Sequence, residues 1–261
     1  MLLFYALSTG GGDMTAIAMG GLGPKPEADR NAFLLLVALV WVGVLTGFGT
    51  DSFDHVSKHG LDYPLIVHFH ALAFVSWLVL FTTQVALIRV GRPDLHRRLG
   101  LAAIALAAVM VVLGPATAVI VDTARYVATG HTPEFMAVQF IDIIAFTTLT
   151  GAGLLLRGKP ETHKRLMLLG LFYISNAGFA RFLNGFAAAP LGDGFGGDIV
   201  GIYLGGDMLA LGLGAYDLIT RRRLYPVYIA GVAWMLALEL TALQLLHSPA
   251  WKAFTLHLIG H

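Results

Sequence analysis

The chain has 261 residues, of which 57% are hydrophobic and 13% charged, and its mean hydropathy is +0.74. A soluble globular domain carries about 25% charged residues, so this composition excludes that class of protein. The net charge of +1 provides no basic surface for nucleic acid. The absence of Cys excludes disulfides, thiolate metal sites and cysteine nucleophiles. The sequence therefore indicates a membrane protein, whose expected partners are membrane lipids and other membrane protein subunits.

The first element in chain order is a Gly-rich tail over residues 1–31. Its glycines and prolines break helices, and it lacks the basic start of a signal peptide. A segment of this composition stays disordered unless it packs against another surface. We expect residues 1–24 to be ordered by lipid or by a second chain, which predicts an accessory or structural subunit of a larger membrane complex.

Seven apolar stretches follow within residues 32–248, each long enough to cross a hydrocarbon core of about 30 Å as a helix. They cover residues 32–48, 64–88, 99–121, 134–156, 165–187, 199–219 and 225–247. Lipid offers the backbone no hydrogen-bond partner, so each stretch must be helical. Residues 249–261 form a short tail that we expect at the membrane interface. The predicted fold is an all-α, polytopic membrane bundle of about seven transmembrane helices.

The Lys and Arg residues fall on one side of this predicted topology. Most of the 17 cations precede the first span or lie between spans 2 and 3, 4 and 5, or 6 and 7. The opposite connections are acidic. The positive-inside rule then places the N-terminus in the cytoplasm and the C-terminus in the periplasm or exterior. The location that we expect is a bacterial inner membrane, with the C-terminus in the periplasm.

Two of the basic loops share one motif. Gly91 to Leu99 and Gly158 to Leu166 both match G-[RK]-P-[DE]-x-H-[RK]-R-L at every defined position. Because both loops lie on the same side, residues 64–130 and 131–190 are expected to be parallel repeats of a helix pair. His96 and His163 occupy equivalent places in the motif, either as capping or interfacial residues or as ligands.

These motifs carry a resemblance. The run His68-Phe69-His70-Ala71 ahead of Trp77 and Gln84, the Gly-Arg-x-x-x-His-Arg-Arg-Leu-Gly loop and the His-Lys-Arg-Leu-Met sequence that begins at His163 resemble a bacterial family of predicted multi-pass membrane proteins of unknown function. The resemblance covers roughly residues 64–185 and implies a helical membrane fold without an activity.

More distantly, the chain is similar in general plan to the b561-type cytochromes, in which histidines from different helices hold haem. That similarity implies haem b as a candidate cofactor. The outer ligands would be His70 with His247 or His131, and the inner ligands His96 with His163. If haem is not bound, the expected cofactor is a lipid or quinone, or none.

Polar side chains inside the spans are functional candidates because burying them in lipid is costly. His70, Asp142, Asp207 and Glu239 form one candidate set, for a non-haem metal ion bound by imidazole and carboxylate. Arg181 is the cation deepest in a predicted span, and an unpaired Arg there would be prohibitive. It is therefore expected to form a structural ion pair with one of those three carboxylates.

A further signal comes from one predicted helix. His70, Trp77 and Gln84 recur every seven residues, so they line one stripe of that helix. The sequence has no Walker loop, G-x-S-x-G, H-E-x-x-H or dinucleotide fingerprint, and it identifies no catalytic residue. Beside the accessory subunit, two alternatives stay open: a haem- or metal-linked redox protein using the bundle histidines, and a small transporter.

Overall fold

The structure is a computed structural model that describes residues 26–192 and 194–261. The described residues form helices and connecting loops without any strand, and seven of the helices are long and apolar enough to cross a membrane. These helices are α2 (Pro26–His59), α3 (Leu65–Arg89), α4 (Pro93–Thr129), α5 (Met136–Leu155), α6 (Pro160–Leu183), α7 (Phe195–Arg221) and α8 (Pro226–Leu246). The predicted all-α bundle with seven membrane-spanning helices is confirmed.

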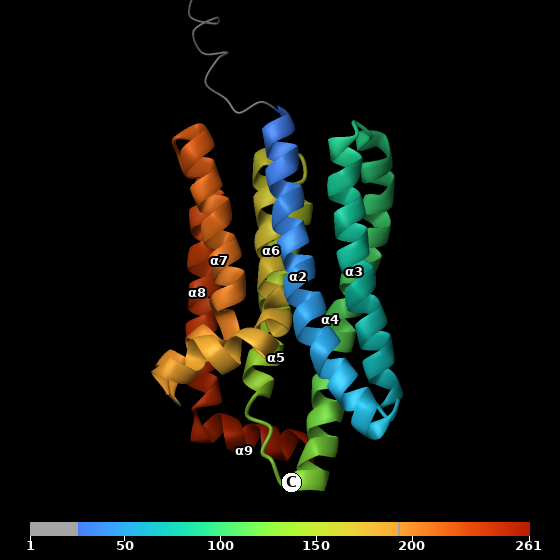
Figure 1. Cartoon of the computed structure of the whole chain (residues 1–261), viewed down its shortest axis with the longest axis vertical. Helices are drawn as coiled ribbons and strands as arrows, with labels where there is room; N and C mark the ends of the chain where they lie inside the picture. The colour runs from blue at the N-terminus through green and yellow to red at the C-terminus, as the bar shows by residue number, and fades with distance from the viewer. Residues whose placement is uncertain (1–25, 193) are drawn as a thin grey trace, which may run out of the picture.

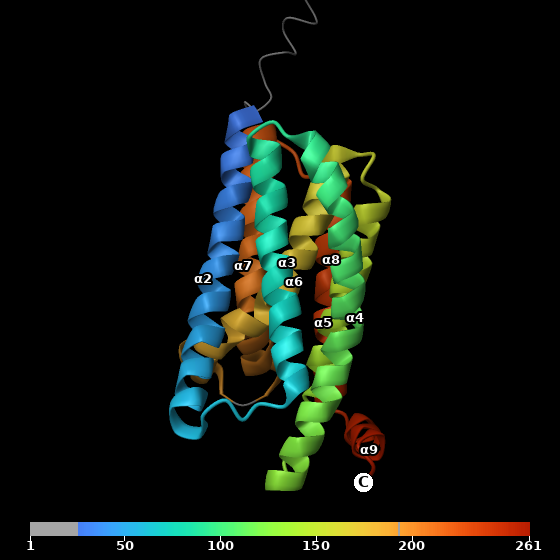
Figure 2. The ribbon, with the colours of Figure 1, turned by 90° about the vertical axis from the view of Figure 1, so that its right-hand side faces the viewer.

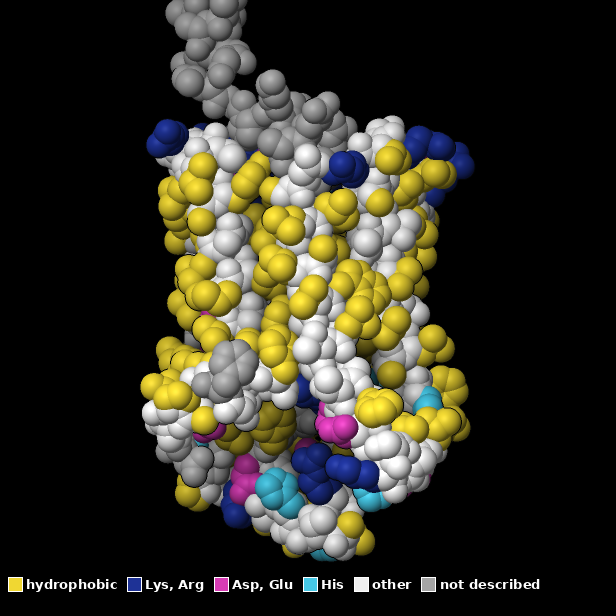
Figure 3. Space-filling model, in the orientation of Figure 1, with side chains coloured by type: hydrophobic (Ala, Val, Ile, Leu, Met, Phe, Trp, Pro, Cys, Tyr) yellow, Lys and Arg dark blue, Asp and Glu magenta, His cyan; other side chains and the backbone are white. Residues whose placement is uncertain are grey.

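The helices run up and down, so their connections alternate between two ends of the bundle (Figures 1 and 2). We call one of these ends the basic end. It holds the α3–α4, α5–α6 and α7–α8 connections, and Lys and Arg side chains gather there, at the top of Figure 3. The distal end holds the other connections and a short helix, α9 (Pro249–Leu258), which lies across it (Figure 1).

Proline sets the start of several helices at the basic end. Pro93, Pro160 and Pro226 each occupy the first helical position of α4, α6 and α8. A helix needs no N–H at that position, and the fixed φ of proline suits it. The two motif loops therefore enter their helices in the same way, while the repeat relation between the helix pairs stays a prediction.

Several predicted boundaries differ from the helices. The helix α2 begins at Pro26, inside the expected tail, and runs to His59, well beyond the expected end at residue 48. Part of the expected C-terminal tail is the helix α9. An apolar stretch marks where a helix lies in lipid, whereas the helix itself continues where polar side chains meet water. The expected ordering of residues 1–24 lies outside the described residues.

Close backbone contacts hold α6 against its neighbours. A Cβ atom on Gly47 of α2 would lie 1.9 Å from the carbonyl oxygen of Gly178 of α6. A Cβ on Gly205 of α7 would lie 2.2 Å from Cγ of Phe179. Small residues at such contacts let membrane helices pack closely. The α6 helix therefore has α2 and α7 pressed against it, and it ends in a π-helical turn (Asn184–Ala188).

Candidate functional site

One buried polar group lies among α5, α6, α7 and α8. We call it the acidic cluster, and its members are Asp142, Tyr173, Tyr203, Asp207 and Glu239. Glu239 and both tyrosines are fully buried, and Asp142 is 7% exposed. Electrostatic interactions couple Asp207 to Glu239 and both tyrosines to Asp142 and Glu239. Four helices thus bring three carboxyl groups and two phenols together.

Helical spacing and one glycine build this arrangement. Tyr203 and Asp207 are four residues apart on α7, so they share a face of that helix. The rings of Tyr173 and Tyr203 lie with centroids 5.8 Å apart. Beside them, Asn176 Oδ1 accepts a hydrogen bond of 2.7 Å from the backbone N–H of Gly206. A Cβ on Gly206 would lie 2.6 Å from that oxygen, so glycine lets α6 and α7 approach at this level.

The acidic cluster is short of hydrogen bonds. In the described part of the chain, no hydrogen bond of good geometry reaches Asp142 Oδ1, the Glu239 carboxyl oxygens, the Tyr173 and Tyr203 hydroxyls or Asn176 Nδ2. The two tyrosines interact with each other, and Glu239 interacts with Asp207, so these groups have only other members of the acidic cluster beside them. Burying a polar group without a partner is costly, and burying an uncompensated charge costs more. The cluster therefore needs protons, water or a bound ligand.

The expected ion pair between Arg181 and these carboxylates is wrong. Arg181 Nε lies 3.3 Å from Asp51 Oδ2, its guanidinium lies 3.9 Å from the centre of the Phe48 ring, and its side chain is 37% exposed. The reason is the position of Arg181 along α6. The helix α6 ends at Leu183, four residues before the expected end of the span at residue 187, so Arg181 sits in its last turn. From there its long side chain reaches the distal end instead of the core.

Arg165, near the start of α6, is fully buried. It donates two hydrogen bonds to the buried carboxylate of Asp217, from Nε at 2.7 Å and from Nη2 at 2.6 Å. Its Nη1 donates to the Glu161 side chain at 2.7 Å, and its guanidinium lies 3.6 Å from the centre of the Tyr225 ring. Such two-pronged pairing is the strongest form of carboxylate recognition by Arg.

Arg165 belongs to a closed set of charges at the basic end. We call it the charge network, and it consists of Asp29, Glu161, Lys164, Arg165, Asp217 and Arg221. Lys164 Nζ lies 3.1 Å from Asp29 and 2.8 Å from Glu161. Arg221 pairs with Asp217 at 2.9 Å and also with Asp29. Three acidic and three basic side chains balance one another and tie α2, α6 and α7 together.

The electrostatics of Asp29 show this balance. Burial opposes ionisation of Asp29, but hydrogen bonds from Tyr216, Arg221 and Lys164 outweigh it and lower the pKa of Asp29 below its usual value. The sequence does not predict this network, because Lys164, Arg165 and Arg221 lie in or beside the basic connections between spans, where a cation is expected at the membrane surface. A usable signal existed: Glu161 and Asp217 each lie four residues before an Arg, the spacing of a helical ion pair.

Two of the candidate haem ligands come together. The rings of His96 and His163 meet edge to face at the basic end with centroids 6.2 Å apart. His163 Nδ1 lies 2.8 Å from the carbonyl oxygen of Gly153, so it donates that hydrogen bond and leaves Nε2 as a lone pair. His96 Nδ1 is buried and has no hydrogen-bond partner among residues 26–192 and 194–261.

The outer histidines do not form a pair. His247 Nε2 lies 2.8 Å from Asp198 Oδ2, which joins the distal ends of α7 and α8. His70 stacks on Phe74, with ring centroids 4.1 Å apart, and its ring donates a hydrogen bond to the backbone carbonyl of Leu113 on α4. The alternative outer partner, His131, lies in the exposed α4–α5 connection. The outer haem site expected from the sequence is therefore not assembled.

The expected metal centre is also not formed. Within the described residues, no group of three or more His, Asp or Glu side chains is arranged to hold a metal ion. His70 faces α4, whereas Asp142, Asp207 and Glu239 meet on the other side of the bundle, among α5, α7 and α8. The four residues expected to bind one ion thus belong to two separate environments.

The charge network and the acidic cluster differ in the chemistry that they can support. The charge network compensates itself, while the acidic cluster has acceptor oxygens and hydroxyls in excess and can take up positive charge. No protein-family model, curated protein or solved structure matches this chain.

Proposed function

We propose that this integral membrane protein is a small transporter that binds and passes protons through the acidic cluster. The observation that carries the proposal is a group of three carboxyl side chains inside the bundle with which no Lys or Arg of the described residues interacts. Ionisable groups at such a position typically belong to substrate paths or proton relays.

The charge balance supports this role. Three carboxylates at close range in a medium of low dielectric constant repel one another, and each loses its hydration. The chain's own buried cation does not relieve them, because Arg165 is bound by Asp217 and Glu161. The nearest cation of α6 on the other side, Arg181, is engaged by Asp51. The positive charge that the acidic cluster requires must come from outside the protein.

The depth of the cluster favours entry from the distal end. Asp142 lies six residues after the start of α5, and Glu239 lies seven residues before the end of α8. At the rise of an α-helix, each is about 10 Å along its helix from the distal end. The positive-inside rule makes that end periplasmic, because Lys and Arg gather at the basic end. We infer that protons enter from the periplasm.

The phenols supply the relay. A tyrosine hydroxyl donates and accepts hydrogen bonds, so it can hand a proton from one carboxyl group to another. Tyr173 and Tyr203 are both buried beside the carboxyl groups of Asp142 and Glu239, and neither hydroxyl is engaged elsewhere in the described residues. An alkali cation would bind the same oxygens, and the experiment below distinguishes transport of protons from transport of such a cation.

The test is proton flux in proteoliposomes that contain a trapped pH-sensitive dye. An outward potassium gradient with valinomycin sets an inside-negative potential that drives protons inward. The wild-type chain should acidify the interior, and Glu239→Gln and Asp142→Asn should each slow this at least tenfold. Asp54→Asn is the matched control, because Asp54 is an exposed carboxylate on α2. Equal rates in all four proteins, or a flux that requires sodium, would contradict the proposal.

A second candidate function, a haem-linked redox protein, rests on the pair at the basic end. The hydrogen bond from His163 to Gly153 fixes the tautomer in the way that metal-bound histidines commonly show. With His96, it would supply two axial nitrogens. An absorption spectrum of the purified protein tests this directly: a Soret band that is lost in His163→Ala supports the redox function, and a colourless protein removes it.

The role of accessory subunit stays a prediction. Its main support was the Gly-rich tail, and residues 1–25 lie outside the described part of the chain. Copurification of a second membrane protein that is lost on deleting residues 1–24 would support it.

A further inference from the structure

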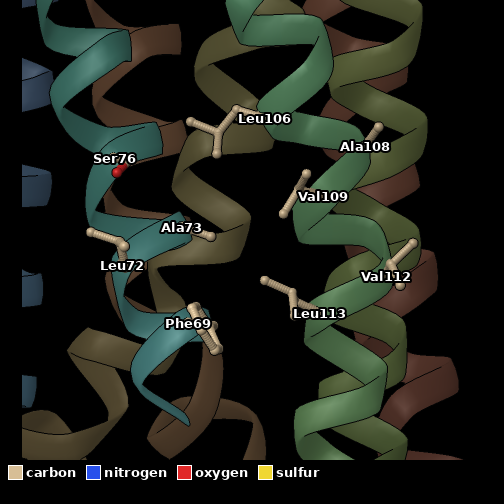
Figure 4. A pocket seen from close by; sticks show the side chains of 9 residues that line it. All are labelled: Phe69, Leu72, Ala73, Ser76, Leu106, Ala108, Val109, Val112 and Leu113. Carbon is tan, nitrogen blue, oxygen red and sulfur yellow. The ribbon is translucent and has the colours of Figure 1, made fainter. Parts of the chain in front are cut away.

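The helix α3 and the connection that leads into it differ in the ligands that they can offer. An apolar groove of about 750 Å³ lies between α3 and α4, and Figure 4 shows Phe69, Val109 and Leu113 pointing into it. Ser76 supplies the only hydroxyl of its lining, so the groove has almost no atom that could bind an ion. The α2–α3 connection at the distal end, in contrast, gathers imidazole rings and a carboxylate (Figure 2).

Two histidines lie one turn apart at the end of α2. His55 and His59 are four residues apart, so they share one face of the helix, and their ring centroids lie 5.1 Å apart. The ring of His55 also stacks on Tyr63, at 4.0 Å between centroids, which restricts its rotation. Two imidazoles at this helical spacing can bind one metal ion.

Asp62 orients the first of these rings. Its Oδ1 lies 2.7 Å from His55 Nε2. An ionised carboxylate only accepts hydrogen bonds, so Nε2 carries the proton and the lone pair of the neutral ring is on Nδ1. Metal-bound histidines commonly donate to a carboxylate in this way with the nitrogen that does not bind the metal.

The same carboxylate supplies negative charge. The hydrogen bond from His55 lowers the pKa of Asp62 below its usual value, and attraction by His59 acts in the same direction. Asp62 is therefore ionised at neutral pH, and both rings lie close enough to feel its charge. A cation bound by the two rings would be partly neutralised by it.

The rings are accessible to ions from the distal side. The helix α2 continues past the apolar stretch that ends at residue 48, and His55 lies seven residues further on, about 10 Å along the helix. This distance places both rings at or beyond the membrane surface. The side chain of His55 is 33% exposed, and His59 is exposed.

We propose that His55 and His59 bind a divalent transition-metal ion such as Zn²⁺, and that Asp62 holds His55 in the tautomer that binds it. Imidazole nitrogen suits Zn²⁺, Cu²⁺ and Ni²⁺, whereas Mg²⁺ and Ca²⁺ take oxygen ligands. Two protein ligands are fewer than the three or four of catalytic and structural zinc sites. Water therefore completes the coordination, and the ion exchanges with the solution at the distal end.

This site lies apart from the proposed proton path. It belongs to α2 and the α2–α3 connection, whereas the carboxyl groups of the acidic cluster come from α5, α7 and α8. Metal binding can therefore be measured without proton flux, and either proposal can fail without the other.

The test is competition for Zn²⁺ between the detergent-solubilised full chain, prepared without a histidine tag, and a chromophoric zinc indicator. His55→Ala and His59→Ala each remove one of the two ligands and should weaken Zn²⁺ binding by more than about tenfold. Asp62→Asn keeps an acceptor oxygen but loses the charge, so it should weaken binding less, by up to about tenfold. His257→Ala is the matched control, because His257 is an exposed histidine on α9, and it should leave binding unchanged.

A second measurement reports the ligands directly. The electron paramagnetic resonance spectrum of bound Cu²⁺ should show splitting by two imidazole nitrogens in the wild-type chain and by one in His59→Ala. Thermal melting of each variant establishes that it is folded. The proposal is overturned if the wild-type chain takes no Zn²⁺ from the indicator. Equal affinity in the wild-type chain, His55→Ala and His59→Ala would overturn it as well, because the ion would then bind elsewhere.

Discussion

The charge network and the acidic cluster contain the same number of carboxyl groups but opposite surroundings. Both draw on α7, where Asp217 belongs to the first and Asp207 to the second, about 15 Å apart along the helix. In the charge network every carboxylate touches a Lys or Arg. In the described part of the chain, no Lys or Arg interacts with the three carboxyl groups of the acidic cluster. Burial alone therefore does not mark a functional site in this protein. Carboxylates that are paired with Lys or Arg hold helices together, whereas buried carboxyl groups without such a partner need a ligand or protons.

The largest effect is expected from Arg165→Leu. This change leaves Asp217 buried without its main partner, and it should lower the free energy of unfolding by about 3–5 kcal/mol. The measurement is the unfolding equilibrium in mixed detergent micelles, followed by circular dichroism.

The chain offers a matched control for this variant. Arg98 occupies the equivalent place in the first basic loop but is exposed, so Arg98→Leu should change stability by less than about 0.5 kcal/mol. Equal losses in the two variants would show that the loops, and not the buried pair, determine stability.

Removing one charge from each region should give opposite results. Asp217→Asn weakens the bonds to Arg165 and Arg221 and should cost about 2–4 kcal/mol. Glu239→Gln removes a carboxyl group that has no cation, so stability should stay equal or rise by about 1 kcal/mol. The same unfolding assay checks both. A loss of similar size for Glu239→Gln would mean that Glu239 has a structural partner and would erase the contrast.

The sequence predicts the helices well because apolar length is a local property. Helix register is less local, and it decides which arginine is buried. The apolar run placed Arg181 inside a span and Arg165 at its edge, but α6 starts at Pro160 and ends at Leu183. That shift of a few residues, about one helical turn, exchanges the two environments.

The sites depend even more on long-range pairing. The shared loop motif singled out His96 and His163 as an equivalent pair, and the structure brings these two together. Asp29, in contrast, lay in the predicted tail, and its partners Lys164 and Arg221 are far along the chain. No periodicity within one helix encodes such contacts. The sequence names Asp142, Asp207 and Glu239 one by one as polar residues within spans, and the structure places them together. Arg181, the cation expected beside them, pairs with Asp51 instead.

Acid should weaken the charge network in a defined direction. The pKa of Asp29 is lower in the folded protein than its usual value, so the unfolded chain binds more protons as pH falls through this range. The stabilisation is complete above the unfolded pKa and is lost as pH drops through the folded one. Melting temperatures between pH 3 and pH 7 should fall toward acid in the wild-type protein. In Asp29→Asn the fall should be shallower, and an identical slope in both proteins would remove Asp29 from the network's contribution.

A small loss of stability is expected for Arg181→Leu, where the sequence alone predicts one of the largest. Arg181→Leu removes an ion pair with Asp51 in which both side chains are partly exposed to solvent, at 37% and 61%. Exposed pairs of this kind contribute about 0–1 kcal/mol, because water screens the charges and both side chains lose freedom. The variant also loses the contact with Phe48, which is of similar size at an exposed position. Stability in detergent should therefore fall by no more than about 1–2 kcal/mol, well below the loss in Arg165→Leu. A loss of stability as large as that of Arg165→Leu would mean that Arg181 pairs with the carboxyl groups of the acidic cluster. That cluster would then have a structural role like that of the charge network.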